Sequence, residues 1–221
     1  MKKIVSMLAV AGLAVAANAD VIISEVVDGD LSGGNPKFVE LTNTGVAAYV
    51  FGAGDSIQVY SNGSISASAT VSLNGISIAP GDSYVIASSA NDGINQFNIA
   101  YGFGADLFTT AFFSNGDDVY ALNIGGTVVD SAGQIGVDGT GTGWEYLDSY
   151  GFRNPTSITQ GAFNLADWTF GGVAALDGPD DATRIALLQA NTTPGTHNFV
   201  PAPGALALVG LGGLVAGRRR R

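Results

Sequence analysis

Residues 119–129 read VYALNIGGTVV, two β-rich runs joined by a glycine pair. A Gly-Gly connection between two such runs is a strong signal for a β-hairpin. Similar runs occur upstream, bounded by turn residues, at 21–27, 37–43, 56–60, 70–73 and 83–87. Short strands at this spacing predict an all-β chain that folds as an antiparallel β-sandwich or barrel.

The composition agrees with a turn-rich chain. Of the 19 acidic residues in the 221-residue sequence, 16 are aspartates and three are glutamates. Aspartate favours turns and helix caps, whereas glutamate favours helices. We therefore expect helix only in short pieces, at 165–168 after Asn164 and at 181–189.

Several classes of site are excluded by residue type. The chain has no cysteine and a single histidine, His197, which rules out disulfides, thiolate metal sites and sites built from several imidazoles. Residues 20–200 carry all 19 acidic residues and only three basic ones, so their formal charge is −16. Because nucleic-acid binding depends on Lys and Arg, we expect no nucleic-acid partner.

The N-terminus has the pattern of a secretory signal peptide. Met1-Lys2-Lys3 precedes an apolar run over 4–17, and Ala17-Asn18-Ala19 forms an A-x-A cleavage motif before Asp20. A basic start, a short apolar stretch and small residues at the cleavage site are typical of such signals. We expect cleavage after Ala19, with Ala17 and Ala19 read by the peptidase, and export of a single domain at 20–200.

The C-terminus has the pattern of a membrane segment. Residues 200–217 form an uncharged stretch of 18 residues, which as a helix would be ~27 Å long, close to the hydrocarbon thickness of a bilayer. A terminal basic cluster would stay cytoplasmic, and here it consists of Arg218, Arg219, Arg220 and Arg221. We expect a transmembrane helix in this segment.

The segment 201–221 resembles the PEP-CTERM sorting signal of Gram-negative bacteria. Its order is Pro201-Ala202-Pro203, an apolar stretch and the Arg cluster, with Ala202 where the family has glutamate. The resemblance implies export and processing by an exosortase-type enzyme. It also implies anchoring in the inner membrane in transit, followed by delivery to the cell surface or extracellular matrix.

The central region resembles the lamin-tail domain in its secreted bacterial form. The segments that carry this resemblance span roughly 22–198, and the main ones are 23–29, 38–43, 78–87, 113–122 and 128–136. The resemblance implies an immunoglobulin-like β-sandwich that serves as a scaffold or adhesion-like module. It implies no catalytic residues, so none are assigned.

Acidic turns are candidates for Ca²⁺ binding. Asn115-Gly116-Asp117-Asp118 places two adjacent carboxylates in one turn, and Ca²⁺ takes ~6–8 oxygen ligands. The alternative is a turn that its own aspartates cap, which Asn-Gly favours. The same two interpretations apply to the acidic runs at 28–30 and 177–181. We expect no cofactor other than Ca²⁺.

Two further features have a functional and a structural interpretation. Glu25 and Glu40 lie in predicted strands and could form the carboxylate pair of a hydrolase, or they could lie on the solvated face of a sheet.

Trp144 follows the glycine-rich residues 139–143, where it could stack on a sugar ring or belong to the core.

These observations together predict an exported, non-enzymatic β-sandwich that contacts an extracellular polysaccharide or an envelope protein. A Ca²⁺-dependent carbohydrate- or protein-binding module is the first alternative. A secreted hydrolase is a less favoured one, because the central region has few His, Lys and Arg residues.

Overall fold

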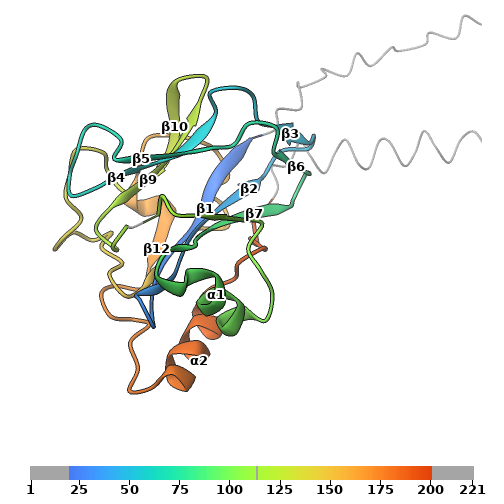
Figure 1. Ribbon diagram of the computed structural model, residues 1–221. Helices are drawn as coiled ribbons and strands as arrows, with labels where there is room; N and C mark the ends of the chain where they lie inside the picture. The colour runs from blue at the N-terminus through green and yellow to red at the C-terminus, as the bar shows by residue number, and fades with distance from the viewer. Residues whose placement is uncertain (1–19, 113, 201–221) are drawn as a thin grey trace, which may run out of the picture.

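The computed structural model describes residues 20–112 and 114–200, which form two packed β-sheets with two helices at one end (Figure 1). The predicted signal peptide, cleavage motif, sorting motif and C-terminal membrane segment lie outside the described residues. Within the described part of the chain, no helix is long and apolar enough to span a bilayer.

The larger sheet has six strands in the order β12-β11-β1-β2-β7-β8. Its strands are β1 (Val21–Leu31), β2 (Asn35–Asn43), β7 (Ser83–Ser88), β8 (Leu107–Thr109), β11 (Tyr150–Arg153) and β12 (Trp168–Phe170). Neighbouring strands are antiparallel except for β7 and β8, which are parallel. The long pair β1 and β2 forms the centre of this sheet.

The smaller sheet has four antiparallel strands in the order β10-β9-β4-β5. They are β4 (Ser56–Tyr60), β5 (Ala69–Ser72), β9 (Val119–Ile124) and β10 (Thr127–Ala132). Two short strands, β3 (Tyr49–Val50) and β6 (Ser77–Ile78), pair separately. The hairpin predicted at the Gly125-Gly126 pair is confirmed, because β9 and β10 pair with Thr127 opposite Ile124.

The main core lies between the two sheets and is built from alternate strand residues. One set comes from β1 and β2 and the other from β4 and β9; together they include Val21, Ile23, Val26, Leu41, Ile57, Val59, Tyr120 and Leu122. The alternation along β1 shifts by one residue between Ile23 and Val26 because the ladder has a bulge at Ser24. A bulge places two residues opposite one on the partner strand.

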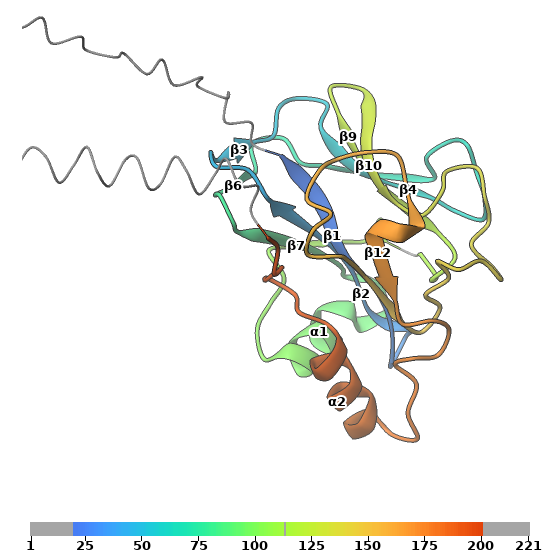
Figure 2. The ribbon, with the colours of Figure 1, turned by 180° about the vertical axis from the view of Figure 1, so that it is seen from behind.

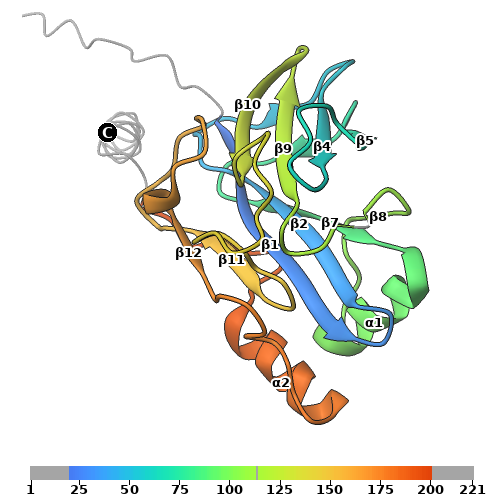
Figure 3. The same cartoon turned by 90° about the vertical axis from the view of Figure 1, so that its left-hand side faces the viewer.

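The outer face of the larger sheet is covered by the helices α1 (Gly93–Tyr101) and α2 (Asp181–Asn191). Phe38 of β2 contacts the rings of Phe97 and Tyr101 in edge-to-face geometry, and Leu188 of α2 is buried in the same cluster. Figure 3 shows both helices beside one end of β1 and β2.

Both short helical pieces predicted from the sequence are confirmed. The helix α2 begins after Asp180, whose carboxylate accepts the Thr183 N–H, and the 3-10 turn η2 (Leu165–Asp167) begins after Asn164. The helix α1, which follows the 3-10 turn η1 (Ala90–Asp92), is a correction to the prediction of an all-β chain. The fold is mostly β with antiparallel sheets.

The two ends of the described chain lie close together, at the end of the molecule away from the helices (Figure 2). The Thr44 N–H donates to the Asp20 carbonyl at 2.9 Å, and the Thr44 hydroxyl donates to the Ile158 carbonyl at 2.7 Å. The Val200 N–H donates to Pro155 in the same loop as Ile158, at 2.8 Å. The first and last described segments are therefore fixed to one loop, 155–158.

Candidate functional site

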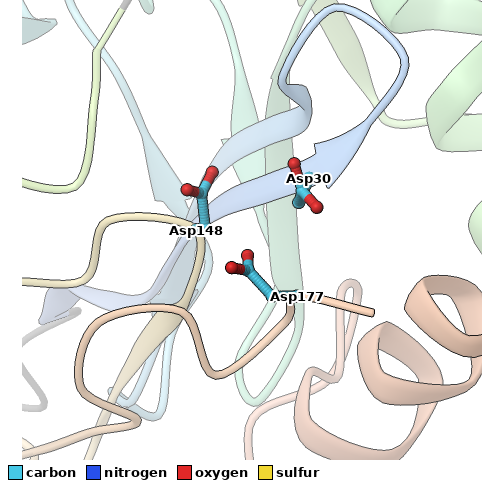
Figure 4. Close-up of side chains that lie close together, drawn as sticks. All are labelled: Asp30, Asp148 and Asp177. Carbon is cyan, nitrogen blue, oxygen red and sulfur yellow. The ribbon is translucent and has the colours of Figure 1, made fainter. Parts of the chain in front are cut away.

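Three carboxylates meet at the helical end of the larger sheet, and we call them the distal cluster: Asp30, Asp148 and Asp177. One oxygen of each lies within 4.8 Å of the other two, and Figure 4 shows the side chains converging from separate segments. Asp30 lies near the end of β1, Asp148 precedes β11 and Asp177 precedes α2. Asp177 is exposed and the other two are half-buried.

Backbone hydrogen bonds hold the loops of the distal cluster. The Asp148 N–H donates to the Asp28 carboxylate at 3.3 Å, and Asp148 has a left-handed backbone with φ 46°. The Leu176 N–H donates to the Asp148 carbonyl at 2.9 Å. These contacts bring the segment before α2 against the segment before β11, so Asp177 faces Asp148.

Burial and mutual repulsion both act on the carboxylates of the distal cluster. Desolvation, followed by the charges of Asp28, Asp177 and Asp30, raises the pKa of Asp148 to about 6. Two cations partly compensate, because Arg184 Nε lies 2.6 Å from an Asp30 oxygen and Lys37 pairs with Asp28. Clustered oxygen ligands open to solvent could hold a hard divalent cation such as Ca²⁺.

The sequence identified two of the three residues in the distal cluster. The acidic runs 28–30 and 177–181, which are far apart in the chain, supply Asp30 and Asp177, and the fold brings them together. Asp148 was missed, because a single aspartate between Leu147 and Ser149 forms no motif. Only its place before a strand could have drawn attention to it.

The other Ca²⁺ candidates, Asp117 and Asp118, lie outside the distal cluster. The carboxylate of Asp118 is buried and accepts the N–H groups of Asn62 and Asn115 at 2.9 and 3.1 Å. A carboxylate oxygen of Asp117 accepts the Thr140 hydroxyl at 3.2 Å. The capped turn that the sequence offered as the alternative accounts for these contacts.

Glu25 and Glu40 are buried direct neighbours across the β1–β2 ladder, which corrects the interpretation that placed them on a solvated face. Glu25 accepts the Thr193 N–H at 3.1 Å. Glu40 accepts the Gly195 N–H at 2.7 Å and the Ser24 hydroxyl at 2.6 Å. Burial here is possible because these donors replace water.

Burial also changes how the Glu25–Glu40 pair titrates. Desolvation and then the charge of Glu40 raise the pKa of Glu25 well above its ordinary value. Desolvation raises the pKa of Glu40 to about 7, although hydrogen bonds from Ser24 and Gly195 oppose the shift. The pair therefore retains a proton at a pH at which an exposed glutamate has lost it.

A cavity of about 330 Å³ borders Glu25 and is lined by β11, α2 and the segment that follows α2. Its polar lining includes Arg153, Asn191 and His197. Arg153 is itself buried and holds the Asp130 carboxylate at 2.5 Å, with its guanidinium 4.7 Å from the centre of the Trp168 ring. One wall of the cavity therefore carries the Arg153 guanidinium, which is already paired with Asp130.

Trp144 belongs to the packed interior and not to an exposed ligand surface. The residue is 4% exposed, and its ring contacts Phe163 at a centroid distance of 5.9 Å. A methyl group added at Gly139 would lie 2.6 Å from the indole. The glycine-rich stretch thus lets the backbone approach the ring, and the core interpretation of Trp144 is the correct one.

Comparison with known families accounts for this architecture. A model of the Lamin Tail Domain family matches residues 14–136, which is more than half of the chain. Curated proteins and solved structures gave no match. The family fold is a non-enzymatic immunoglobulin-like β-sandwich, consistent with the two sheets described above. The chain belongs to the lamin tail domain family.

Proposed function

We propose that this protein is an exported, non-enzymatic module of the cell envelope or extracellular matrix, tethered at one end and presenting the other. Residues 201–221 would sort it through an exosortase-type enzyme. The membership in the lamin tail domain family supports a structural or binding role. The partner would be an extracellular polysaccharide or an envelope protein.

The observation that carries this proposal is the placement of the chain ends. The segments that begin at Asp20 and end at Val200 are held by one loop, and the helices and the distal cluster lie at the other end of β1 (Figure 3). A domain attached through either end would therefore present the distal cluster away from the attachment point. The high negative charge of the domain would keep the protein soluble while it presents this end.

Deletion of residues 201–221 tests the sorting part of the proposal. We expect the shortened chain to be exported and folded, but recovered from the medium instead of the envelope fraction. A full-length variant with Pro201 and Pro203 both changed to alanine tests processing, and mass spectrometry of the mature protein reports both cut sites. Equal retention of the shortened chain, or recovery of an uncut N-terminus from the cytosol, would contradict the proposal.

A Ca²⁺-dependent binding module is the second candidate, and the specific observation that favours it is the distal cluster. Extracellular modules bind Ca²⁺ with dissociation constants of about 10⁻⁴–10⁻³ M. At a tenfold excess over such a constant, binding to the native state stabilises it by about 1.4 kcal/mol. For a domain of this size we expect a rise in melting temperature of about 3–5 °C.

The test adds 10 mM CaCl₂ to the full chain and follows thermal unfolding. The Asp177→Asn variant removes one carboxylate of the distal cluster and should lose the shift. Asp82→Asn is the matched control, because Asp82 is exposed and distant from the helical end, beside Asn43. The Ca²⁺-dependent module would be ruled out if CaCl₂ did not raise the melting temperature of the unsubstituted chain, or if it raised that of all three proteins equally.

The hydrolase alternative finds no support in the described residues. Its two carboxylates, Glu25 and Glu40, are buried and accept backbone N–H groups from the segment that covers them. A general acid and a nucleophile must instead reach the bond that is cleaved.

A further inference from the structure

The last described segment, Thr192–Val200, crosses the outer face of the larger sheet next to the helices, and we call it the strap. It follows α2 directly and appears in orange to red in Figure 2. It has no regular secondary structure, so its position depends on contacts with the sheet and with α1.

Two buried carboxylates fasten the strap. The Thr193 N–H lies 3.1 and 3.2 Å from the two Glu25 oxygens, and the Gly195 N–H lies 2.7 Å from Glu40 Oε2. The Thr192 hydroxyl adds a 2.7 Å contact with Tyr101 of α1. Carboxylate-to-amide hydrogen bonds are stronger than neutral ones when water is excluded.

The β-bulge brings the two carboxylates and their hydroxyl donors together. Because Ser24 is the extra residue, Ser24 and Glu25 both lie opposite Glu40. The Ser24 hydroxyl donates to Glu40 Oε1, and the Thr42 hydroxyl donates to Ser24 at 2.7 Å. A second hydroxyl contact joins Thr42 to Ser83 of β7, also at 2.7 Å. The network supplies hydroxyls and amides, and no cation contacts either carboxylate within the described residues.

Three other titratable or charged groups face the pair from neighbouring elements: Tyr101 of α1, Arg153 of β11 and His197 of the strap. Burial raises the pKa of Tyr101 far above its ordinary value. Desolvation, and then the charge of Arg153, lowers the pKa of His197 to about 4. The guanidinium of Arg153 is paired with the carboxylate of Asp130. Neither Tyr101 nor His197 changes charge between pH 5 and 9, so within this group a change of charge in that range comes from the two glutamates.

We infer that Glu25 and Glu40 share a proton and act as a pH-operated latch, which holds the strap while the proton is present and releases it when both carboxylates ionise. Two like charges on neighbouring buried carboxylates repel strongly because the local dielectric is low. Detaching the strap is the least disruptive way to admit water to both groups. The raised pKa of Glu40, about 7, places release near neutral pH.

Release of the strap would have two physical consequences. The cavity beside Glu25 would lose the wall formed by Thr193, His197 and Asn198. The connection to residue 201 would also lengthen by up to nine residues, which is roughly 30 Å of extended chain. This inference concerns the domain alone and does not depend on the proposed function.

A spin label on the strap tests the latch directly. The full chain has no cysteine, so Thr196→Cys in the exposed part of the strap gives a single labelling site. We expect the ratio of mobile to immobile label to rise up to about 100-fold between pH 5 and pH 9, because the latched state holds a proton with a pKa of about 7 and the equilibrium shifts about tenfold per pH unit over the two units from 5 to 7. The Glu40→Gln variant should stay immobile, because the amide is neutral and still offers an oxygen to Gly195.

Glu145→Gln is the matched control, because Glu145 is the one glutamate outside the pair and caps an exposed loop through Gly141. It should behave like the unsubstituted chain. Carboxyl ¹³C NMR of the unsubstituted protein, labelled at glutamate, needs no substitution in the pair. We expect the signals of Glu25 and Glu40 to titrate together, at a higher pH than the ordinary glutamate value of about 4.3. Immobile label at every pH, the same response in Glu40→Gln, or independent titration of Glu25 and Glu40 near the ordinary glutamate value of about 4.3 would each overturn the latch.

Discussion

Strand β1 carries acidic residues in two contrasting environments. In the middle of the strand, Glu25 lies beside Glu40 under the strap, and both accept backbone amides. At its end, Asp30 lies near solvent, where Arg184 pairs with it and Lys37 pairs with Asp28. The surroundings therefore decide how each carboxylate is used: desolvation in the middle of the strand favours a retained proton even though the amides oppose it, whereas cations and water favour the charged form.

The largest expected effect is on the pH dependence of stability, and it comes from the middle of the strand. Because the pKa of Glu40 rises from 4.5 to about 7 on folding, its contribution to stability is complete below pH 4.5 and is lost as the pH rises to 7. The size is on the order of 3 kcal/mol, from 1.36 kcal/mol per pKa unit. Urea unfolding at pH 4.5 and 7 should show this slope in the unsubstituted chain and a flatter one in Glu40→Gln. If the free energy of unfolding changed equally between pH 4.5 and 7 in the two proteins, burial would not raise the pKa of Glu40, and the prediction would be wrong.

Truncating the same residue should have the next largest effect. Glu40→Ala leaves the Gly195 N–H and the Ser24 hydroxyl without their acceptor, and each lost hydrogen bond costs about 1 kcal/mol. We expect the free energy of unfolding at pH 6 to fall by about 2 kcal/mol. The control, Glu145→Ala, removes an exposed contact and should cost about 0.5 kcal/mol or less. A similar cost for both variants would contradict the contrast between the buried pair and exposed carboxylates.

Much of the sheet architecture could be predicted from residue pattern. The alternating runs at 37–43 and 56–60 correspond to β2 and β4, and the Gly-Gly turn corresponds to the β9–β10 hairpin. The strands β11 and β12 are only four and three residues long, too short to show a period. The helix α1 contains glycine and asparagine and has little intrinsic helix preference; packing of Phe97 against Phe38 stabilises it.

The sites were harder to predict because they depend on register and on loops. The sequence could identify Glu25 and Glu40 as strand residues, but their pairing requires the bulge at Ser24, which no turn residue marks. The strap that buries them lies 168 residues beyond Glu25 and 155 residues beyond Glu40 along the chain. Likewise, Asp148 joins Asp30 only through the loops before β11 and α2. Contacts between distant segments therefore decide both sites.

A smaller effect is expected at the end of the strand. Asp148→Asn removes a charge that Asp28, Asp177 and Asp30 repel, and asparagine tolerates the left-handed backbone at this position. We expect a gain in stability of a few tenths to about 1 kcal/mol at pH 7, because solvent screens partly exposed charges. The gain should shrink as the pH falls through 6 and be absent at pH 3.8 and below, the ordinary aspartate range, where Asp148 is largely protonated in both the folded and the unfolded chain. Urea unfolding at both pH values measures it, and a loss of stability at pH 7 would show that repulsion does not govern the distal cluster.

The smallest effect is expected for Arg184, the cation of the distal cluster. Its ion pair with Asp30 is about 30% exposed on both sides, and solvent screening leaves such pairs a small contribution to stability. Arg184→Gln should therefore lower stability only slightly at low salt, and by less in 0.5 M NaCl, because ions screen surface charges. The same substitution leaves Asp30 without its cation, so it should strengthen any binding of Ca²⁺ to the distal cluster. Calorimetric titration of CaCl₂ into both proteins measures this second effect. Weaker Ca²⁺ binding in Arg184→Gln would mean that the guanidinium organises the carboxylates instead of competing with the metal.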